Sequence, residues 1–287
     1  KVLSHNEKLT LKCQVVITTH SSHIVNSKIH SSNSFNNINY ITVSDNRSCV
    51  VCLNDSNIMP CESEQSDLKF LKTHIKYKVS ELFFADAVIL VEGMTEESIL
   101  PYFIDKDEEL RKYYISLFRI DGAHSKVYQS LIKLLRIPCL IVTDMDIKRA
   151  AREKNQDEKD DLESNENDSS QIPKKGYYQI SDLTDRETTN TTLSEYWGDS
   201  KLSGKEYYSD ANVHVVYQKD AIEGYYATSF EESILLTNFE NSYLLEVLKG
   251  TMSRIYDTIQ NRIEDEERAI KDYSYEIQSR LGDSSRK

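Results

Sequence analysis

The sequence predicts an α/β protein built on a parallel sheet with helices on both faces. Between residues 87 and 146 the hydrophobic pattern alternates strand, helix, strand, helix and strand. The run at 87–91 contains only apolar residues, which is typical of a strand buried on both faces of a parallel sheet. Such alternation favours right-handed crossovers, which place helices on the faces of the sheet.

The segment before this unit contains a candidate strand, a hairpin and a helix. Residues 14–18 form an apolar run that predicts a strand. Two further runs, 38–45 and 48–54, surround "DNR" and predict a hairpin. Apolar residues recur every three or four positions from 63 to 85, which predicts a helix with Ser66 as a candidate N-cap.

Within the unit, a helix is expected to follow the first strand, with Thr95 as its N-cap and acidic residues in its first turn. The next strand is expected at 114–119, and "SKVYQSLIKLLR" at 125–136 predicts the second helix. These two helices are the crossovers that a parallel sheet requires.

The segment after the unit is expected to add one strand and to end in helix. "NVHVVYQ", residues 212–218, is a strand candidate. Glu231 and Glu232 stand at the start of a short helix. Apolar residues at helical spacing continue from 241 to 281, which predicts a long packing arm with Gly250 as its break.

The stretch "CLIVTDMD", residues 139–146, is a buried-strand pattern that ends in two carboxylates. If the strand continued through Asp146, then Asp144 and Asp146 would share one face, about 7 Å apart. Two like charges so close repel each other unless a cation lies between them, and Mg²⁺ prefers oxygen ligands of this kind. The alternative is that both acids begin a solvated loop.

A second acidic element makes the metal-site interpretation stronger. Glu92 ends the strand at 87–91, and Glu96 follows one helical turn later. In parallel sheets, ligands and catalytic groups gather at the carboxyl ends of the strands. We therefore expect Glu92, Glu96 and the two aspartates to meet at one edge of the sheet.

Bulk composition excludes several classes of protein. The chain has 287 residues, a net charge of −12 and a mean hydropathy of −0.56. No apolar run is long enough for a transmembrane helix, and no signal-peptide pattern follows Lys1, whose position at the start suggests a fragment of a longer chain. Residues 151–170 hold eight acids and three bases, so the charge is concentrated in a segment expected to be a flexible insertion, 147–175.

The cysteines do not predict a disulfide framework, which favours a cytoplasmic protein. Cys49 and Cys52 form a C-x-x-C, but no second pair stands at the spacing of a structural zinc site. We interpret this stretch as a strand with small buried thiols.

Two motifs carry a family resemblance. "AVILVEGMTEESIL", followed some fifty residues later by "LIVTDMD", resembles a Toprim domain, and V-E-G-x-T-E is most similar to the overcoming lysogenization defect (OLD) family of nucleases. "TSFEESIL" resembles the late acidic segment of that family. The resemblance implies a Toprim-type, Rossmann-like parallel sheet and two bound Mg²⁺ or Mn²⁺ ions. It implies as metal ligands Glu92, Glu96, Asp144, Asp146 and Glu231, the first four also being catalytic.

Basic residues complete the expected site. The family has a catalytic lysine near its C-terminus, and Lys287 is the candidate. Lys148 and Arg149 follow the D-x-D directly and are candidates for nucleic-acid phosphate contacts. The alternative for both is the solvated start of the loop.

The N-terminal part resembles the end of an ABC-type ATPase domain. "QVVITTHSSHIV" resembles the last ATPase strand with its ATP-sensing histidine, which would be His20, although Ser22 stands where the family usually has proline. The alternative for His20 is a histidine in a hydrogen-bonded turn. No Gly-rich phosphate loop occurs, so ATP would bind through a missing N-terminal part. The expected domains are an ATPase tail at 1–62, a Toprim nuclease at 63–240 and a helical segment at 241–287.

The resemblance predicts a divalent-metal-dependent endonuclease that nicks DNA, acting in antiphage defence. It implies a homodimer or higher oligomer and a partner such as a helicase or a reverse transcriptase. One alternative is a structural or regulatory Toprim module that is latent until a partner activates it, and another is RNA cleavage. A primase- or topoisomerase-like Toprim is disfavoured because no tyrosine lies in a recognisable nucleophile motif.

Overall fold

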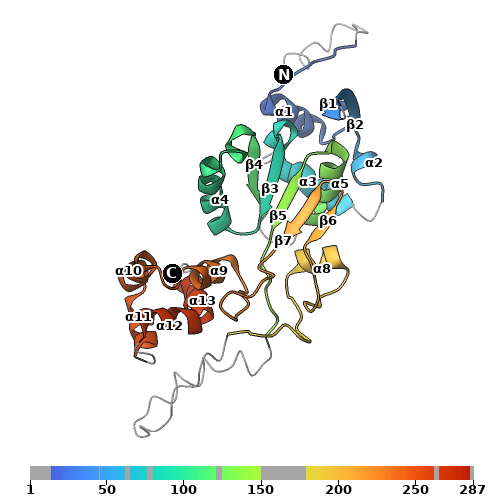
Figure 1. Cartoon of the computed structure of the whole chain (residues 1–287). Coiled ribbons are helices and arrows are strands. Elements are labelled where there is room, and N and C mark those ends of the chain that lie inside the picture. Colours follow the sequence, from blue (N-terminus) through green and yellow to red (C-terminus); the bar gives the residue numbers. More distant parts are fainter. Residues whose placement is uncertain are drawn as a thin grey trace.

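The computed structural model (Figure 1) describes residues 14–44, 46–61, 65–75, 80–120, 125–149, 179–261 and 265–284. Most of the insertion expected at 147–175 lies outside the described residues, and so does Lys287.

A five-stranded sheet forms the centre of the chain and confirms the predicted α/β class. Its strands lie in the order β4-β3-β5-β7-β6. The first four are parallel and β6 is antiparallel at one edge. Their bounds are β3 Ala87–Val91, β4 Ile115–Arg119, β5 Cys139–Val142, β6 Tyr208–Asp210 and β7 Val213–Val216. All but the short β6 were predicted.

The chain order explains why both faces of the sheet are covered. The chain passes from β3 to β4 on one side of it, and then from β4 to β5 on the opposite side of β3, so the two crossovers run in opposite directions across the sheet. Two right-handed crossovers in opposite directions place their helices on opposite faces. Accordingly, α4 (Met94–Lys106) lies on one side of the strands and α5 (Ser125–Leu135) on the other, next to α3 (Gln65–His74) (Figure 1).

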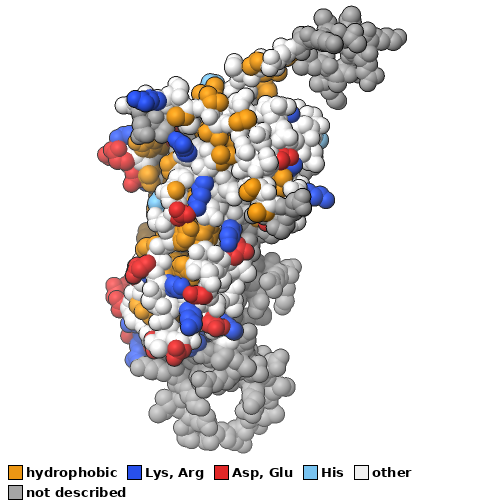
Figure 2. All heavy atoms as spheres, turned by 90° about the vertical axis from the view of Figure 1, so that its right-hand side faces the viewer, with side chains coloured by type: hydrophobic (Ala, Val, Ile, Leu, Met, Phe, Trp, Pro, Cys, Tyr) orange, Lys and Arg blue, Asp and Glu red, His pale blue; other side chains and the backbone are white. Residues whose placement is uncertain are grey.

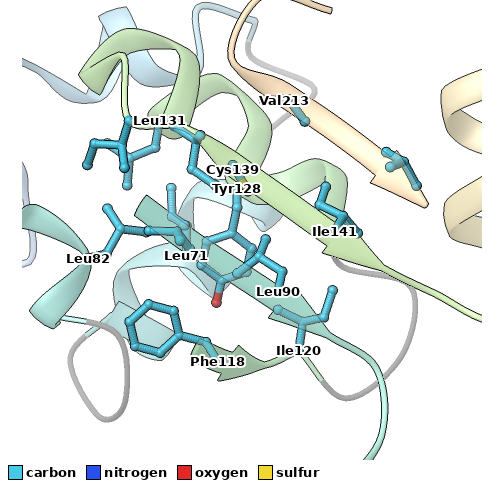
Figure 3. Close-up of a cluster of buried hydrophobic side chains, with 14 of the residues drawn as sticks. Leu71, Leu82, Leu90, Phe118, Ile120, Tyr128, Leu131, Cys139, Ile141 and Val213 are labelled. Carbon is cyan, nitrogen blue, oxygen red and sulfur yellow. The ribbon is translucent and has the colours of Figure 1, made fainter. Parts of the chain in front are cut away.

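The main hydrophobic core lies between the sheet and helices α3 and α5. Leu71, Leu90, Tyr128 and Leu131 are fully buried there (Figure 3). Burying each such leucine contributes about 1.5 to 3 kcal/mol. The hydroxyl of Tyr128 contacts Nδ1 of His74, so the one buried polar atom of this ring has a partner.

The N-terminal apolar run is not a strand, contrary to the sequence-based expectation. Val15, Val16 and Ile17 are 54%, 78% and 60% exposed in irregular structure. An apolar run becomes a strand only where another strand pairs with it, and no strand of the described residues lies beside this one. The exposed His20 follows, with its ring 6.4 Å from that of Phe84, and precedes α1 (Ser22–Ser32), a helix that was not predicted.

The predicted hairpin is confirmed as β1 (Ile38–Ser44) and β2 (Arg47–Leu53). The expected burial of both C-x-x-C thiols is wrong, because Cys52 is exposed and Cys49 only half-buried. Residues three apart on a strand point to opposite faces, so the two thiols cannot share a ligand. Both are free cysteines.

The helix expected over 63–85 is shorter than predicted. It comprises α3, and a separate 3₁₀ helix, η3 (Ser80–Phe84), precedes β3. Ser66 lies inside α3 rather than before it, so it is not the N-cap. The remaining short elements are α2 (Asp55–Ile58), η4 (Leu110–Lys112) and α8 (Thr191–Trp197).

The C-terminal part is a cluster of short helices rather than one long arm. It comprises α10 (Ser242–Thr251), α11 (Ser253–Gln260), α12 (Glu266–Asp272) and α13 (Ser274–Ser284). The first break falls at Met252, whereas Gly250 lies inside α10. Together with α9 (Phe230–Thr237), these helices bury a second apolar cluster that includes Leu235, Leu248, Ile259, Ile270 and Ile277. None of the helices in the described residues is long and apolar enough to cross a bilayer.

Candidate functional site

The predicted acids lie at the carboxyl ends of two neighbouring strands. Glu92 follows β3, and Asp144 and Asp146 follow β5, which is hydrogen-bonded to β3. The strand ends at Val142, so the condition that it continues through Asp146 is not met. The aspartates instead lie on a loop, where Asp146 has a left-handed φ of 45°.

An asparagine distant in sequence joins the two strand ends. The Nδ2 of Asn190 donates hydrogen bonds to both carboxylate oxygens of Glu92, at 3.3 and 3.1 Å, and to Oδ2 of Asp146, at 3.2 Å. Its Oδ1 accepts from the Leu193 N–H, so the same side chain is the N-cap of α8. Thr143 donates a further hydrogen bond to Glu92. The amide group of Asn190 therefore links Glu92 to Asp146.

Asp144 is fixed by two donors from other parts of the chain. Its Oδ1 accepts from Nε2 of Gln218 and from the backbone N–H of Phe230, both at 2.8 Å. Burial, with smaller contributions from the negative charges of Asp146 and Glu96, raises the pKa of Asp144 to about 8, against a lowering by the Gln218 hydrogen bond. Asp144 thus lies close enough to the other acids to be affected by their charge.

Glu96 lies in the first turn of α4 and is 2% exposed. Its Oε2 is buried and has no hydrogen-bond partner among the described residues. A Cβ on Gly93 would lie 2.4 Å from this oxygen, so the glycine is what allows the carboxylate its place. Burial raises the pKa of Glu96, and the charges of Glu231 and Glu92 add to the rise. The N-cap of α4 is Gly93, so the prediction of Thr95 was wrong.

Glu231 joins the group from the helical part of the chain. It lies in the first turn of α9, and its Oε1 accepts a hydrogen bond of 2.6 Å from the Thr95 hydroxyl of α4. Its charge contributes to the raised pKa of Glu96. The structure therefore brings all five predicted acids into one neighbourhood.

The donor chemistry of this neighbourhood fits a hard divalent cation. Burial, together with the charge of Glu92, also raises the pKa of Asp146, even though Asn190 opposes the rise. A cation would relieve that repulsion and would supply the missing partner of Glu96 Oε2. In the part of the chain that the structure describes, however, no three His, Cys, Asp or Glu side chains already stand as a ligand set around one point.

Two of the predicted basic residues follow the acidic loop directly, and each contacts a partner outside the group of five acids. Lys148 is exposed and forms an ion pair of 2.5 Å with Glu187. The guanidinium of Arg149 is stacked on the ring of Tyr275, 3.4 Å from its centroid. On the face shown in Figure 2, Lys and Arg side chains are interspersed with Asp and Glu rather than gathered in one basic patch. His20 lies before α1.

Sequence reasoning did not identify the groups that hold the acids. Thr143 and Thr95 lie inside the motifs "TDMD" and "EGMTEE", so their closeness to the acids could have been inferred from the sequence. Asn190 and Gln218 lie 44 and 74 positions from the aspartates that they contact. No local pattern connects residues so far apart.

A parallel sheet with a glutamate after one strand, a D-x-D after its neighbour and a second acidic helix nearby defines a Toprim-type, Rossmann-like fold. Residues 83–146 match the family described as overcoming lysogenization defect protein-like, TOPRIM domain. The chain therefore contains a domain of the OLD-like Toprim family at residues 83–146.

The chain is also similar to a curated protein. It is 47% identical over 287 residues to endonuclease GajA of Bacillus cereus (strain HuB5-5), a match that covers 97% of this chain and 39% of that protein. The chain thus spans about two fifths of the length of this relative. No solved structure shows a significant match.

Proposed function

We propose that this chain carries the metal-dependent phosphodiester-cleaving centre of an endonuclease. The observation that carries the proposal is the gathering of five carboxylates from the ends of β3 and β5 and the first turns of α4 and α9, around the buried, unpartnered Oε2 of Glu96. The similarity to a protein named endonuclease GajA supports the reaction class.

Each acid has a role in this proposal. The residues that would hold two Mg²⁺ or Mn²⁺ ions are Glu92, Glu96, Asp144, Asp146 and Glu231. A bound pair of such ions stabilises the attacking and leaving oxygens of a phosphodiester. Asn190 orients Glu92 and Asp146, and Gln218 orients Asp144, through the hydrogen bonds described above. A carboxylate of the group orients the attacking water and accepts its proton.

The three basic residues have different proposed roles. Lys148 is exposed next to the acidic loop, which supports a contact with a substrate phosphate. The stacking of Arg149 on Tyr275 supports a structural role instead. Lys287 stays the proposed catalytic lysine, which would offset charge on the transition-state phosphate.

The proposed substrate is DNA, with RNA as the alternative. We further propose an antiphage role in the cytoplasm, a homodimer or higher oligomer, and a defence partner such as a helicase or a reverse transcriptase. ATP would act through residues that precede this chain, with His20 as their sensor. The proposed domains remain 1–62, 63–240 and 241–287.

A second candidate is a nuclease that stays latent until a partner activates it. Mn²⁺ binding by the full-length protein without plasmid nicking would favour this candidate.

The first test is cleavage of supercoiled plasmid by the full-length protein with Mg²⁺ or Mn²⁺. Asp144→Ala is expected to abolish nicking, whereas Asp182→Ala is the matched control, because Asp182 is an exposed aspartate that only supports a turn at Thr184. Circular dichroism checks that both variants are folded. Nicking by a folded Asp144→Ala protein would refute the proposal. A parallel assay with single-stranded and double-stranded RNA separates the two substrate classes.

A further inference from the structure

The junction between α12 and α13 contacts the segment that carries Glu231. Asp272 ends α12 and Ser274 begins α13, and both are buried, at 4% and 0% exposure. Asp272 accepts hydrogen bonds from the Tyr225 hydroxyl, at 3.1 Å, and from Nε of Arg268, at 3.2 Å. Ser274 donates to Oε1 of Glu232 at 3.1 Å.

Glu232 carries this contact to the start of α9. Its other oxygen, Oε2, accepts from the backbone N–H of Thr228 at 2.7 Å and from the Thr228 hydroxyl at 2.8 Å. The Ser229 hydroxyl in turn accepts from the Glu232 N–H, so Ser229 and Glu232 form a capping arrangement similar to a capping box. Glu232 is 1% exposed, so these hydrogen bonds replace those that its carboxylate would make with water.

The residues that Glu232 fixes are those that contact the acidic loop. The backbone oxygen of Thr228 accepts from the Asp146 N–H at 2.9 Å, and the Phe230 N–H donates to Oδ1 of Asp144 at 2.8 Å. Glu231 lies between Phe230 and Glu232. One short segment, 228–232, thus binds both aspartates and carries the fifth acid.

Two residues from the flanks of the segment at 150–178 meet the same junction. Gln179 donates to the Ser274 hydroxyl at 2.8 Å and accepts from the Tyr275 N–H at 3.1 Å. Arg149 is stacked on the Tyr275 ring, and its charge lowers the pKa of Glu232 against the larger effect of burial. The junction is therefore a buried contact with several side-chain hydrogen bonds, and such a contact fixes relative position.

We propose that Ser274 is a positioning residue of the acid site, acting through Glu232. Its hydroxyl anchors the start of α9 to the C-terminal helices, and thereby sets the position of Glu231 and of the Phe230 N–H relative to Asp144. This inference rests on the proposed function, because its readout is the binding of a divalent metal by the acids.

The test compares Mn²⁺ binding by the full-length protein and by Ser274→Ala, measured by calorimetry or by the paramagnetic resonance of free Mn²⁺. Partners in the outer shell of a metal site change affinity by about 10- to 100-fold. Since Ser274 acts through one further residue, we expect the lower end, about a tenfold loss of Mn²⁺ affinity. Plasmid nicking should require correspondingly more Mn²⁺ for half-maximal rate.

The matched control is Ser279→Ala, on the same helix. Ser279 is exposed, unlike Ser274, and its hydroxyl donates only to the Glu276 backbone oxygen within α13. This variant should bind Mn²⁺ as the parent protein does. Equal Mn²⁺ affinity of the parent and Ser274→Ala would overturn the positioning role while leaving the proposed function intact.

A double-mutant cycle with Glu232→Gln tests the route of the effect. If Ser274 acts through Glu232, the double variant should bind Mn²⁺ no more weakly than Glu232→Gln alone. If the fold-loss of Mn²⁺ affinity in the double variant equals the product of the losses in the two single variants, Ser274 does not act through Glu232. Absence of Mn²⁺ binding by the parent protein would instead refute the proposed function, and the positioning role with it.

Discussion

Asn190→Ala is the substitution for which the structure gives the clearest quantitative expectation. It removes a donor shared by Glu92 and Asp146 and also the N-cap of α8. Loss of an N-cap costs about 1 kcal/mol, and each hydrogen bond to a charged group contributes about 1.5 to 3 kcal/mol. Because the two carboxylates are partly exposed and water replaces part of the loss, we expect a total loss of stability near 3 kcal/mol.

The control is Asn241→Ala, which removes an N-cap and nothing else. The Asn241 side chain accepts from the Tyr243 N–H at the start of α10 and is exposed to solvent. This variant should lose only about 1 kcal/mol. The difference of about 2 kcal/mol corresponds to roughly 4 to 8 °C in the melting temperature of a domain of this size.

The assay is thermal unfolding without and with saturating Mg²⁺. Asn190 orients two of the proposed metal ligands, so Asn190→Ala should bind Mg²⁺ more weakly than Asn241→Ala, and Mg²⁺ should widen the difference in melting temperature between the two variants. Plasmid nicking by Asn190→Ala should fall about 10- to 100-fold. The reasoning would be refuted if Asn190→Ala were no less stable than Asn241→Ala, or if Mg²⁺ left the gap unchanged.

Three further expectations concern the same acids. Gly93→Ala should change the free energy of unfolding by no more than about 1 kcal/mol, because the φ of −108° at this position suits alanine. The same variant should lower the nicking rate more than tenfold, because the new Cβ displaces the Glu96 carboxylate. Nicking at the parent rate would contradict this expectation. Thr95→Val removes the hydroxyl that holds Glu231 and should weaken Mn²⁺ affinity about tenfold, whereas Thr237→Val, which loses only a hydrogen bond within α9, should not. Adding Mg²⁺ at 100 times its Kd should stabilise the protein by about 2.7 kcal/mol, and a melting temperature independent of Mg²⁺ would argue against a bound ion.

The sequence by itself determined the sheet and the places of its acids. Apolar runs at 87–91 and 139–142 form neighbouring parallel strands, and an acidic residue follows each within two positions, so Glu92, Asp144 and Asp146 reach the same edge in any parallel pairing of these strands. This information is local, since strand type and strand end are set by residues within a few positions of one another.

Tertiary structure decided how those acids are held and which residues join them. Asn190 contacts Asp146 across 44 positions, and Thr95 contacts Glu231 across 136, distances over which no periodicity in sequence persists. The same reason accounts for the mistaken strand at 14–18 and the single long helix expected after residue 241. An apolar run indicates that burial of the segment is favourable. The tertiary contacts available to it determine whether it pairs as a strand, forms several short helices or remains exposed.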